Sequence, residues 1–157
     1  MADTWNMLLD ARKLGMTRTR SRVTRGRSLG LSLGSTAKMA RELQRGLSYS
    51  TFVHFCRACG IPVGTIADLV QIPQRTLMRR KAKGRLQPDE SERLLRISGI
   101  FEKAVGLSEG DAAAARRWLT TPSKELDGQT PLDFSRTEIG AREVEDLIGR
   151  LEHGVFT

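Results

Sequence analysis

The stretch from Ile61 to Leu86 most constrains what this chain can fold into, because it has the pattern of two short helices joined by a tight turn. In its first half, apolar residues recur at helical spacing, which gives one face that can enter a core. Pro73 follows, and proline is favoured at the start of a helix, where its missing N–H would be unpaired anyway. The pattern therefore predicts a second helix from Pro73 to Lys83, anchored by Leu77 and ended by Gly84.

Two helices joined by such a turn form the helix-turn-helix unit, in which the N-terminal residues of the second helix reach base edges in the major groove of DNA. Gln74, Arg75 and Thr76 hold that position, and glutamine and arginine can bridge adenine and guanine, respectively. The cations farther along the helix suit phosphates, and these are Arg79, Arg80, Lys81 and Lys83. All of these residues are candidate DNA contacts. The alternative is that the cations only form a solvated helix face.

The charge of the chain also favours a polyanionic partner. Its formal net charge is +8, which fits nucleic acid or an anionic membrane surface. Residues 1–100 hold 19 Lys and Arg against 7 Asp and Glu, whereas residues 101–157 hold 7 against 11. This uneven charge indicates two separate tasks. Because no run approaches the roughly 20 apolar residues that span a bilayer, and no apolar block of a signal peptide is present, we expect a cytoplasmic protein.

The two cysteines, Cys56 and Cys59, form a Cys-x-x-Cys pair beside His54, which invites a metal interpretation. Zinc requires four ligands at compatible spacing, and the only other histidine, His153, lies far away near the C-terminus. We therefore expect core thiols on a helix, and neither a metal nor a cofactor. No Ser/His/Asp or Cys/His arrangement suggests catalysis, so the chain is not expected to be an enzyme.

The periodicity along the rest of the chain predicts helices only, and the expected fold class is all-α. We expect three parts: a flexible basic arm over residues 1–34, the helix-turn-helix domain over 35–86, and a helical domain over 87–157. A short helix near residues 2–14 could either dock or fray. The arm could add phosphate contacts, be a degradation-prone tail, or only keep the protein soluble.

In the C-terminal part, Pro88 opens a long helix, and Ser108 is expected to cap the next one. The last helix should bury an apolar stripe at helical spacing, which consists of Ile139, Val144, Leu147, Ile148 and Leu151.

Five fragments, in this order and spacing, resemble the Xre/MbcA/ParS family of bacterial antitoxins. They are RTLMRRK (75–81), GRLQPDESERLLR (84–96), WLTTP (118–122), LDGQTPLDF (126–134) and IGAREVEDLIGRLEHGVF (139–156). The similarity covers about residues 47–156, so the arm is not explained by it. A second departure is Val105-Gly106-Leu107, where the family often has a Phe-Gly pair; this is a mild substitution for packing.

The resemblance implies an antitoxin of a type II toxin-antitoxin system, with an Xre-like helix-turn-helix domain followed by a toxin-binding domain. Its partner would be a RES-domain toxin, which looks like an ADP-ribosyltransferase and uses NAD. Operator DNA would be a second partner, and the antitoxin would act as a homodimer within the toxin-antitoxin complex.

In the family, the C-terminal end of the antitoxin lies in or over the toxin's active-site cleft. The resemblance therefore assigns toxin binding to Arg150, His153, Gly154, Val155, Phe156 and Thr157. A chain end with one glycine, two apolar residues and a carboxylate is slim enough to enter a nucleotide cleft, although a terminus of this kind can also fray and touch nothing. The alternative function is a helix-turn-helix transcriptional regulator whose C-terminal half serves only dimerisation or sensing.

Overall fold

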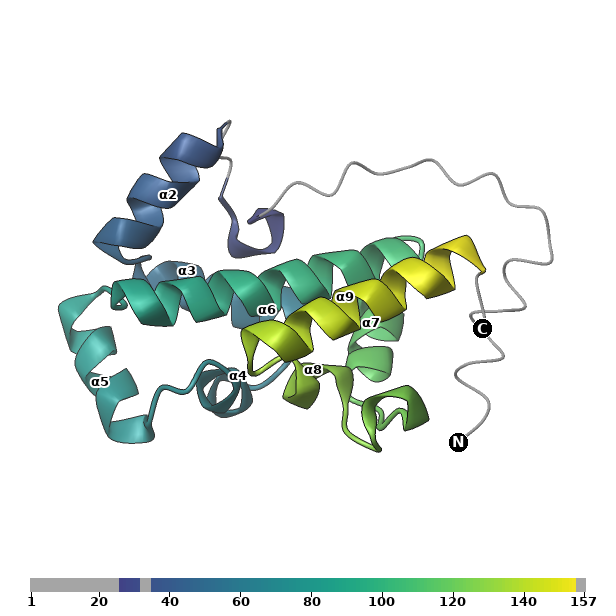
Figure 1. The fold of residues 1–157 in the computed structure, drawn as a ribbon. Coiled ribbons are helices and arrows are strands. Elements are labelled where there is room, and N and C mark those ends of the chain that lie inside the picture. Colours follow the sequence, from purple (N-terminus) through teal and green to yellow (C-terminus); the bar gives the residue numbers. More distant parts are fainter. Residues whose placement is uncertain (1–25, 32–34, 155–157) are drawn as a thin grey trace.

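The computed structural model describes residues 26–31 and 35–154, and in this part of the chain the fold is all-α, as predicted (Figure 1). The helices are α2 (Thr36–Arg45), α3 (Tyr49–Cys59), α4 (Val63–Leu69), α5 (Gln74–Lys83), α6 (Pro88–Leu107), α7 (Ala112–Leu119), α8 (Pro131–Phe134) and α9 (Glu138–His153). Two 3-10 turns, η1 (Arg27–Leu29) and η2 (Lys124–Leu126), complete the described elements. The predicted helix near residues 2–14 lies outside the described residues.

The long helix α6 is the centre of the molecule, and α2, α3, α7, α9 and η1 all pack against it. The helix begins where the sequence predicts, with Pro88 in its first turn, and the Glu90 carboxylate accepts the backbone N–H of Gln87 at 2.8 Å. Its buried stripe includes Leu94, Ile97 and Ile100, which enter the core at one side of the helix. Figure 1 shows α9 lying alongside α6. None of the described helices is both long and apolar enough to cross a membrane.

The helix-turn-helix consists of α4 and α5. Helix α4 buries Ile66 and Leu69. The chain then turns at Gln71, whose φ of 59° is left-handed, and the N–H of Ile72 donates to the carbonyl of Ala67 at 2.8 Å. Helix α5 begins at Gln74, one residue later than predicted, because Pro73 is its N-cap and not its first helical residue; the predicted end is confirmed, since Gly84 ends the helix in the left-handed conformation.

The predicted N-cap of α7, Ser108, is wrong by one short turn. Ser108 ends α6, and the helix that follows is capped by Asp111, whose carboxylate accepts the backbone N–H of Ala114 at 3.0 Å. Between them Glu109 and Gly110 both have positive φ, which reverses the chain. The extra turn was not visible from the periodicity, because Ser108 and Asp111 are both good capping residues.

Ile139 was predicted to belong to the buried stripe of the last helix, but its side chain is 83% exposed. The reason is the close approach of α8 and α9: the backbone at Gly140 lies against the carbonyl of Phe134. This contact turns Gly140, Ala141 and Val144 towards the core, and Ile139 consequently points away from it.

The prediction of a flexible arm does not hold at residues 26–31. Leu29 is 2% exposed and belongs to the main core. The backbone N–H and the hydroxyl of Ser28 both donate to Oε1 of Glu102 on α6, at 2.8 and 2.7 Å. This part of the predicted arm is therefore held against α6 by an apolar side chain and by hydrogen bonds to a buried carboxylate.

Candidate nucleic-acid interface and C-terminal helix

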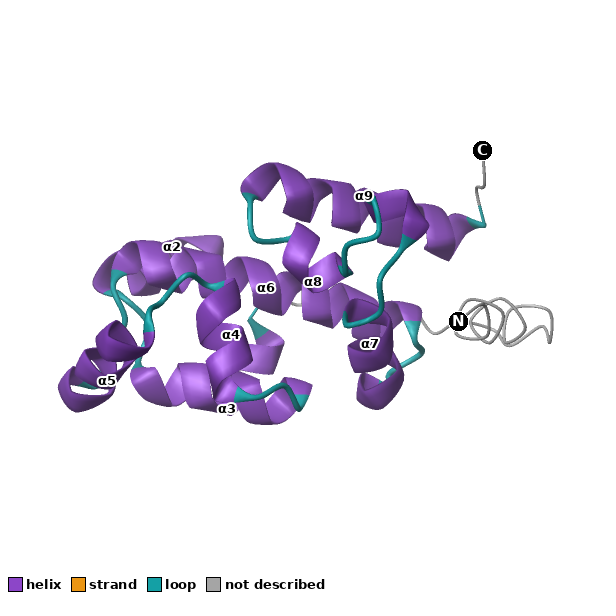
Figure 2. Ribbon diagram, turned by 90° about the horizontal axis from the view of Figure 1, so that it is seen from below, coloured by secondary structure: helices purple, strands orange, loops and turns teal. Residues whose placement is uncertain are grey.

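Helix α5 lies at one end of the molecule (Figures 1 and 2), and most of its polar side chains are exposed. Leu77 is the only buried residue of the helix and is its apolar contact with the core. Most of the predicted DNA contacts are exposed, namely Gln74, Arg75, Arg79, Lys81 and Lys83, and Thr76 is half-buried. Within the described residues, the cations among these have no ion-pair partner. They are therefore available to an external anion.

Arg80 is the exception among the predicted DNA contacts. Its Nε and Nη2 atoms donate to both carboxylate oxygens of Glu90 on α6, at 2.8 to 3.1 Å. The two side chains are only 11% and 7% exposed. Burial alone would raise the pKa of Glu90, but the hydrogen bonds from Arg80 and from the N–H of Gln87 outweigh it and lower that pKa. The predicted phosphate contact is thus a bidentate clamp that fixes α5 to α6.

Acidic residues are scarce in the segment that contains the helix-turn-helix. Between residues 36 and 86 the sequence has only two, Glu42 and Asp68. Glu42 pairs with Arg45 at 3.6 Å, and Asp68 pairs with Arg136 at 2.6 Å. No carboxylate of this segment therefore neutralises the exposed cations of α5.

The two cysteines are buried on α3, with 5% and 1% exposure, as predicted for core thiols. Burial raises the pKa of Cys56 to about 12, which keeps the thiol protonated and unreactive at neutral pH. No group of acidic, histidine or cysteine side chains in the described part of the chain is arranged to hold a metal ion.

Helix α9 carries the predicted toxin-binding residues to the other end of the molecule. Arg150 is exposed and pairs with Glu143 at 3.3 Å, and His153 and Gly154 are exposed at the end of the helix. Gly154 adopts the left-handed conformation that ends a helix, with φ of 67°. The remaining predicted residues, Val155, Phe156 and Thr157, lie outside the described residues. In both views the end of α9 lies far from α5 (Figures 1 and 2).

A polar network joins the two halves of the chain near the start of α9. Arg136 donates to the Asp68 carboxylate at the end of α4, at 2.6 Å, and to the Asp68 carbonyl at 3.0 Å. Arg96 of α6 donates to the carbonyl of Arg136 at 3.1 Å and lies 3.7 Å from Glu138. The first helix of the helix-turn-helix is thereby connected to the C-terminal helices.

Sequence reasoning missed the structural role of Arg80 and this interhelix network. The sequence contained a partial indication of the role of Arg80, because Glu90 was expected in the first turns of α6, shortly after the predicted end of α5. No signal for the second existed, because Arg136 and Asp68 are 68 residues apart in the chain.

Comparison with known proteins matches two families to the two halves. Residues 38–99 match the antitoxin Xre-like helix-turn-helix domain, and residues 104–154 match the antitoxin Xre/MbcA/ParS C-terminal toxin-binding domain. Helix α6 therefore spans the junction between the two matches. Neither of these domains is an enzyme, and the chain is not one.

Curated relatives cover most of the chain. A protein named Antitoxin Xre from Yersinia enterocolitica is 39% identical over 132 residues, which are 83% of this chain and 89% of the relative. Proteins of the same name from Photorhabdus laumondii and Pseudomonas putida are 39% and 36% identical, over 60% and 53% of this chain and 64% and 52% of their own lengths. The chain thus belongs to the Xre antitoxin family, with a DNA-binding helix-turn-helix domain followed by a toxin-binding domain.

Proposed function

We propose that this antitoxin neutralises a RES-domain toxin by placing its C-terminal tail, from Arg150 to Thr157, in the active site of the toxin. The observation that carries the proposal is the position of α9: it leaves the core at an exposed end, within the segment that matches a toxin-binding domain. The resemblance to antitoxins encoded beside RES toxins supports the identity of the partner, which uses NAD. Gly154 with the apolar Val155 and Phe156 gives a narrow segment suited to a nucleotide cleft.

The acidic balance of the C-terminal half supports this partner further. Residues 101–157 hold 11 Asp and Glu against 7 Lys and Arg. A site that binds the phosphates of NAD is expected to be cationic and attracts an acidic surface over long range.

We further propose that the antitoxin acts as a homodimer in the cytoplasm and represses its own operon through α5. Gln74, Arg75 and Thr76 would contact base edges, while Arg79, Lys81 and Lys83 would contact phosphates. These cations are exposed and have no ion-pair partner in the part of the chain that the structure describes, which supports the assignment. Arg80 leaves the set of proposed contacts, because its guanidinium is bound to Glu90.

The proposal is tested by co-expression with the toxin encoded by the adjacent gene. Deletion of Gly154 to Thr157 should abolish growth rescue while operator binding stays at the level of the full chain. The matched control is Arg142→Ala, on an exposed position of the same helix, where the side chain forms a surface ion pair with Glu138 at 3.1 Å. If the truncated protein rescues growth as well as the control, the tail does not block the toxin. If operator binding is absent from the full chain, the alternative assignment of α5 as a solvated helix holds instead.

A further inference from the structure

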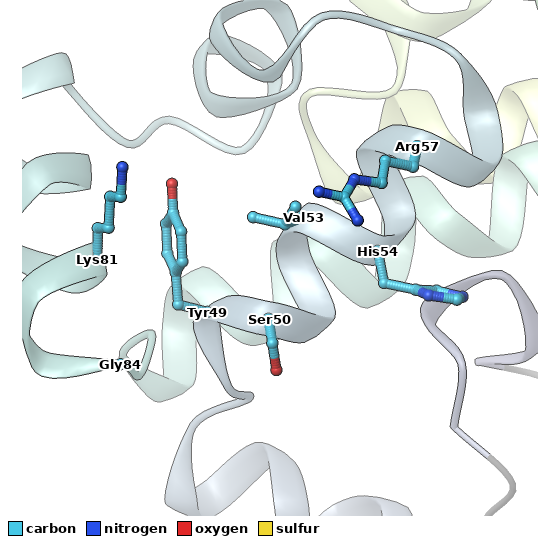
Figure 3. A pocket seen from close by; sticks show the side chains of 7 residues that line it. All are labelled: Tyr49, Ser50, Val53, His54, Arg57, Lys81 and Gly84. Carbon is cyan, nitrogen blue, oxygen red and sulfur yellow. The ribbon is translucent and has the colours of Figure 1, made fainter.

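The outer face of α3 forms a shallow groove together with the end of α5, and the helix-turn-helix motif does not account for it. The groove has a volume of about 540 Å³. Its lining residues come mostly from successive turns of α3, and they are Tyr49, Ser50, Val53, His54, Arg57, Lys81 and Gly84 (Figure 3).

The side chains of this groove offer hydrogen-bond donors and positive charge. Arg57 and Lys81 are exposed cations without an ion-pair partner among the described residues. Tyr49, Ser50 and His54 add groups that can donate, and no carboxylate lines the groove. Figure 3 shows the Tyr49 hydroxyl and the Lys81 ammonium projecting side by side. This combination suits a phosphodiester, which is anionic and accepts hydrogen bonds but donates none.

The groove is fixed in position relative to the proposed DNA-reading helix. The backbone N–H of Tyr49 donates to the carbonyl of Gly84 at 2.9 Å, directly at the end of α5. Next to it, the N–H of Leu86 donates to the carbonyl of Leu47 at 2.8 Å, and Ser48 forms an isolated bridge with Arg85. Lys81 belongs both to α5 and to the groove. A DNA strand that passes over the surface of α5 can therefore continue along α3 without a conformational change in the protein.

We infer that this groove binds the sugar-phosphate backbone of the operator beside the segment read by α5, and that it does so without base preference. The inference rests on the proposed operator binding and extends it to a second element, with Arg57 and Lys81 as the charged contacts. Counterion release makes the proposal quantitative: each lost phosphate contact makes the slope of log affinity against log salt concentration shallower by about 0.9.

The experiment measures the affinity of the full-length protein for operator DNA and for random duplex DNA over a range of salt concentrations. Arg57→Ala and Lys81→Ala should each make the salt slope shallower by about 0.9, and the double variant by about 1.8. Both duplexes should lose affinity by the same factor, because no base is read. Arg57→Lys should restore the slope, since it keeps the charge. The matched control is Arg117→Ala, which removes an exposed arginine from α7 in the toxin-binding half and should leave the slope unchanged.

The outcomes separate this inference from operator recognition itself. If wild-type protein prefers the operator but Arg57→Ala behaves like Arg117→Ala, the groove does not bind DNA and the inference fails. If Arg57→Ala leaves DNA binding intact and weakens the complex with the toxin, the groove binds a protein and the inference is equally overturned. If the wild-type protein shows no preference for the operator, the proposed repression fails. DNA binding by the groove is then still tested on random duplex DNA, where an unchanged salt slope for Arg57→Ala would overturn it.

Discussion

On α5, the guanidinium of Arg80 is buried against Glu90, whereas the side chain of its neighbour Arg79 is exposed. Adjacent residues on a helix point about 100° apart, so one can fix the helix while the other faces a ligand. The same reasoning separates Arg75, at the start of the helix, from the cations that follow. These differences predict distinct effects for substitutions that look alike in the sequence.

Arg75→Ala should reduce the preference for the operator over other sequences, at a cost of about 1–3 kcal/mol in specific binding, because a bidentate contact to guanine is lost. Arg79→Ala should weaken all duplexes alike and make the salt dependence shallower, because a phosphate contact carries no sequence information. Titrations of operator and scrambled duplexes at several salt concentrations measure both effects. Equal loss of preference in the two variants would contradict the assigned roles.

Arg80→Ala should destabilise the fold by about 3 kcal/mol, because it leaves the Glu90 carboxylate buried without its partner. Arg79→Ala is the control and should change the free energy of unfolding by less than about 0.5 kcal/mol, as is usual at an exposed position. Denaturant unfolding of both variants measures the difference. An Arg80→Ala protein as stable as the control would show that the pair does not hold α5.

The same ion pair predicts an acid-dependent stability. The pKa of Glu90 is lower in the folded protein than its ordinary value, so the folded state binds the proton less readily than the unfolded state. The stabilisation is therefore complete above the ordinary glutamate pKa of about 4.3 and is lost as the pH falls below it, through the folded-state pKa. Unfolding free energies measured between neutral and acidic pH should fall less steeply in Glu90→Gln than in the wild type. Identical pH profiles would contradict this contribution.

Among the helices, the seating of α9 depends on one glycine. A Cβ at Gly140 would collide with the backbone carbonyl of Phe134, whereas a Cβ at Gly149 on the same helix would meet nothing within 4 Å. Alanine favours a helix over glycine by about 1 kcal/mol where space allows it. Replacement by alanine is consequently expected to have opposite effects on stability at the two glycines of α9.

Gly149→Ala should stabilise the protein by about 0.5–1 kcal/mol, and Gly140→Ala should destabilise it by about 2 kcal/mol, because α8 and α9 must separate. Chemical denaturation of the two variants provides the comparison. Because α9 also carries the proposed inhibitory tail, Gly140→Ala should additionally weaken toxin neutralisation. A stabilising Gly140→Ala would mean that the contact with Phe134 does not set the position of the helix.

Across the whole molecule, the sequence predicted the elements better than their environments. The limits of α5 were predicted to within one residue because Pro73 and Gly84 act locally on the backbone. The exposure of Ile139 was not predictable, because it depends on how α9 meets α8. The role of Arg80 depends on which side of α5 faces α6. The contact of Ser28 with Glu102 joins residues 74 positions apart, so no local sequence pattern predicts it.

At the same scale, the proposed DNA-reading helix and the end of α9 lie at opposite ends of the molecule (Figures 1 and 2). This separation means that substitutions at one end should leave the function of the other intact. The network of Arg136 with Asp68 connects the two halves through exposed groups, and a surface ion pair of this kind contributes only about 0–1 kcal/mol. We therefore expect the two activities to be largely independent in the purified protein.

The most direct test measures NAD consumption by the toxin while antitoxin is added, with the wild type, the protein lacking Gly154 to Thr157, and the Arg75→Ala, Arg79→Ala double variant. The double variant should inhibit the toxin at the same stoichiometry as the wild type although its affinity for the operator is reduced. The truncated protein should bind the operator normally and leave NAD consumption uninhibited. Full inhibition by the truncated protein would contradict the proposed role of the C-terminal tail.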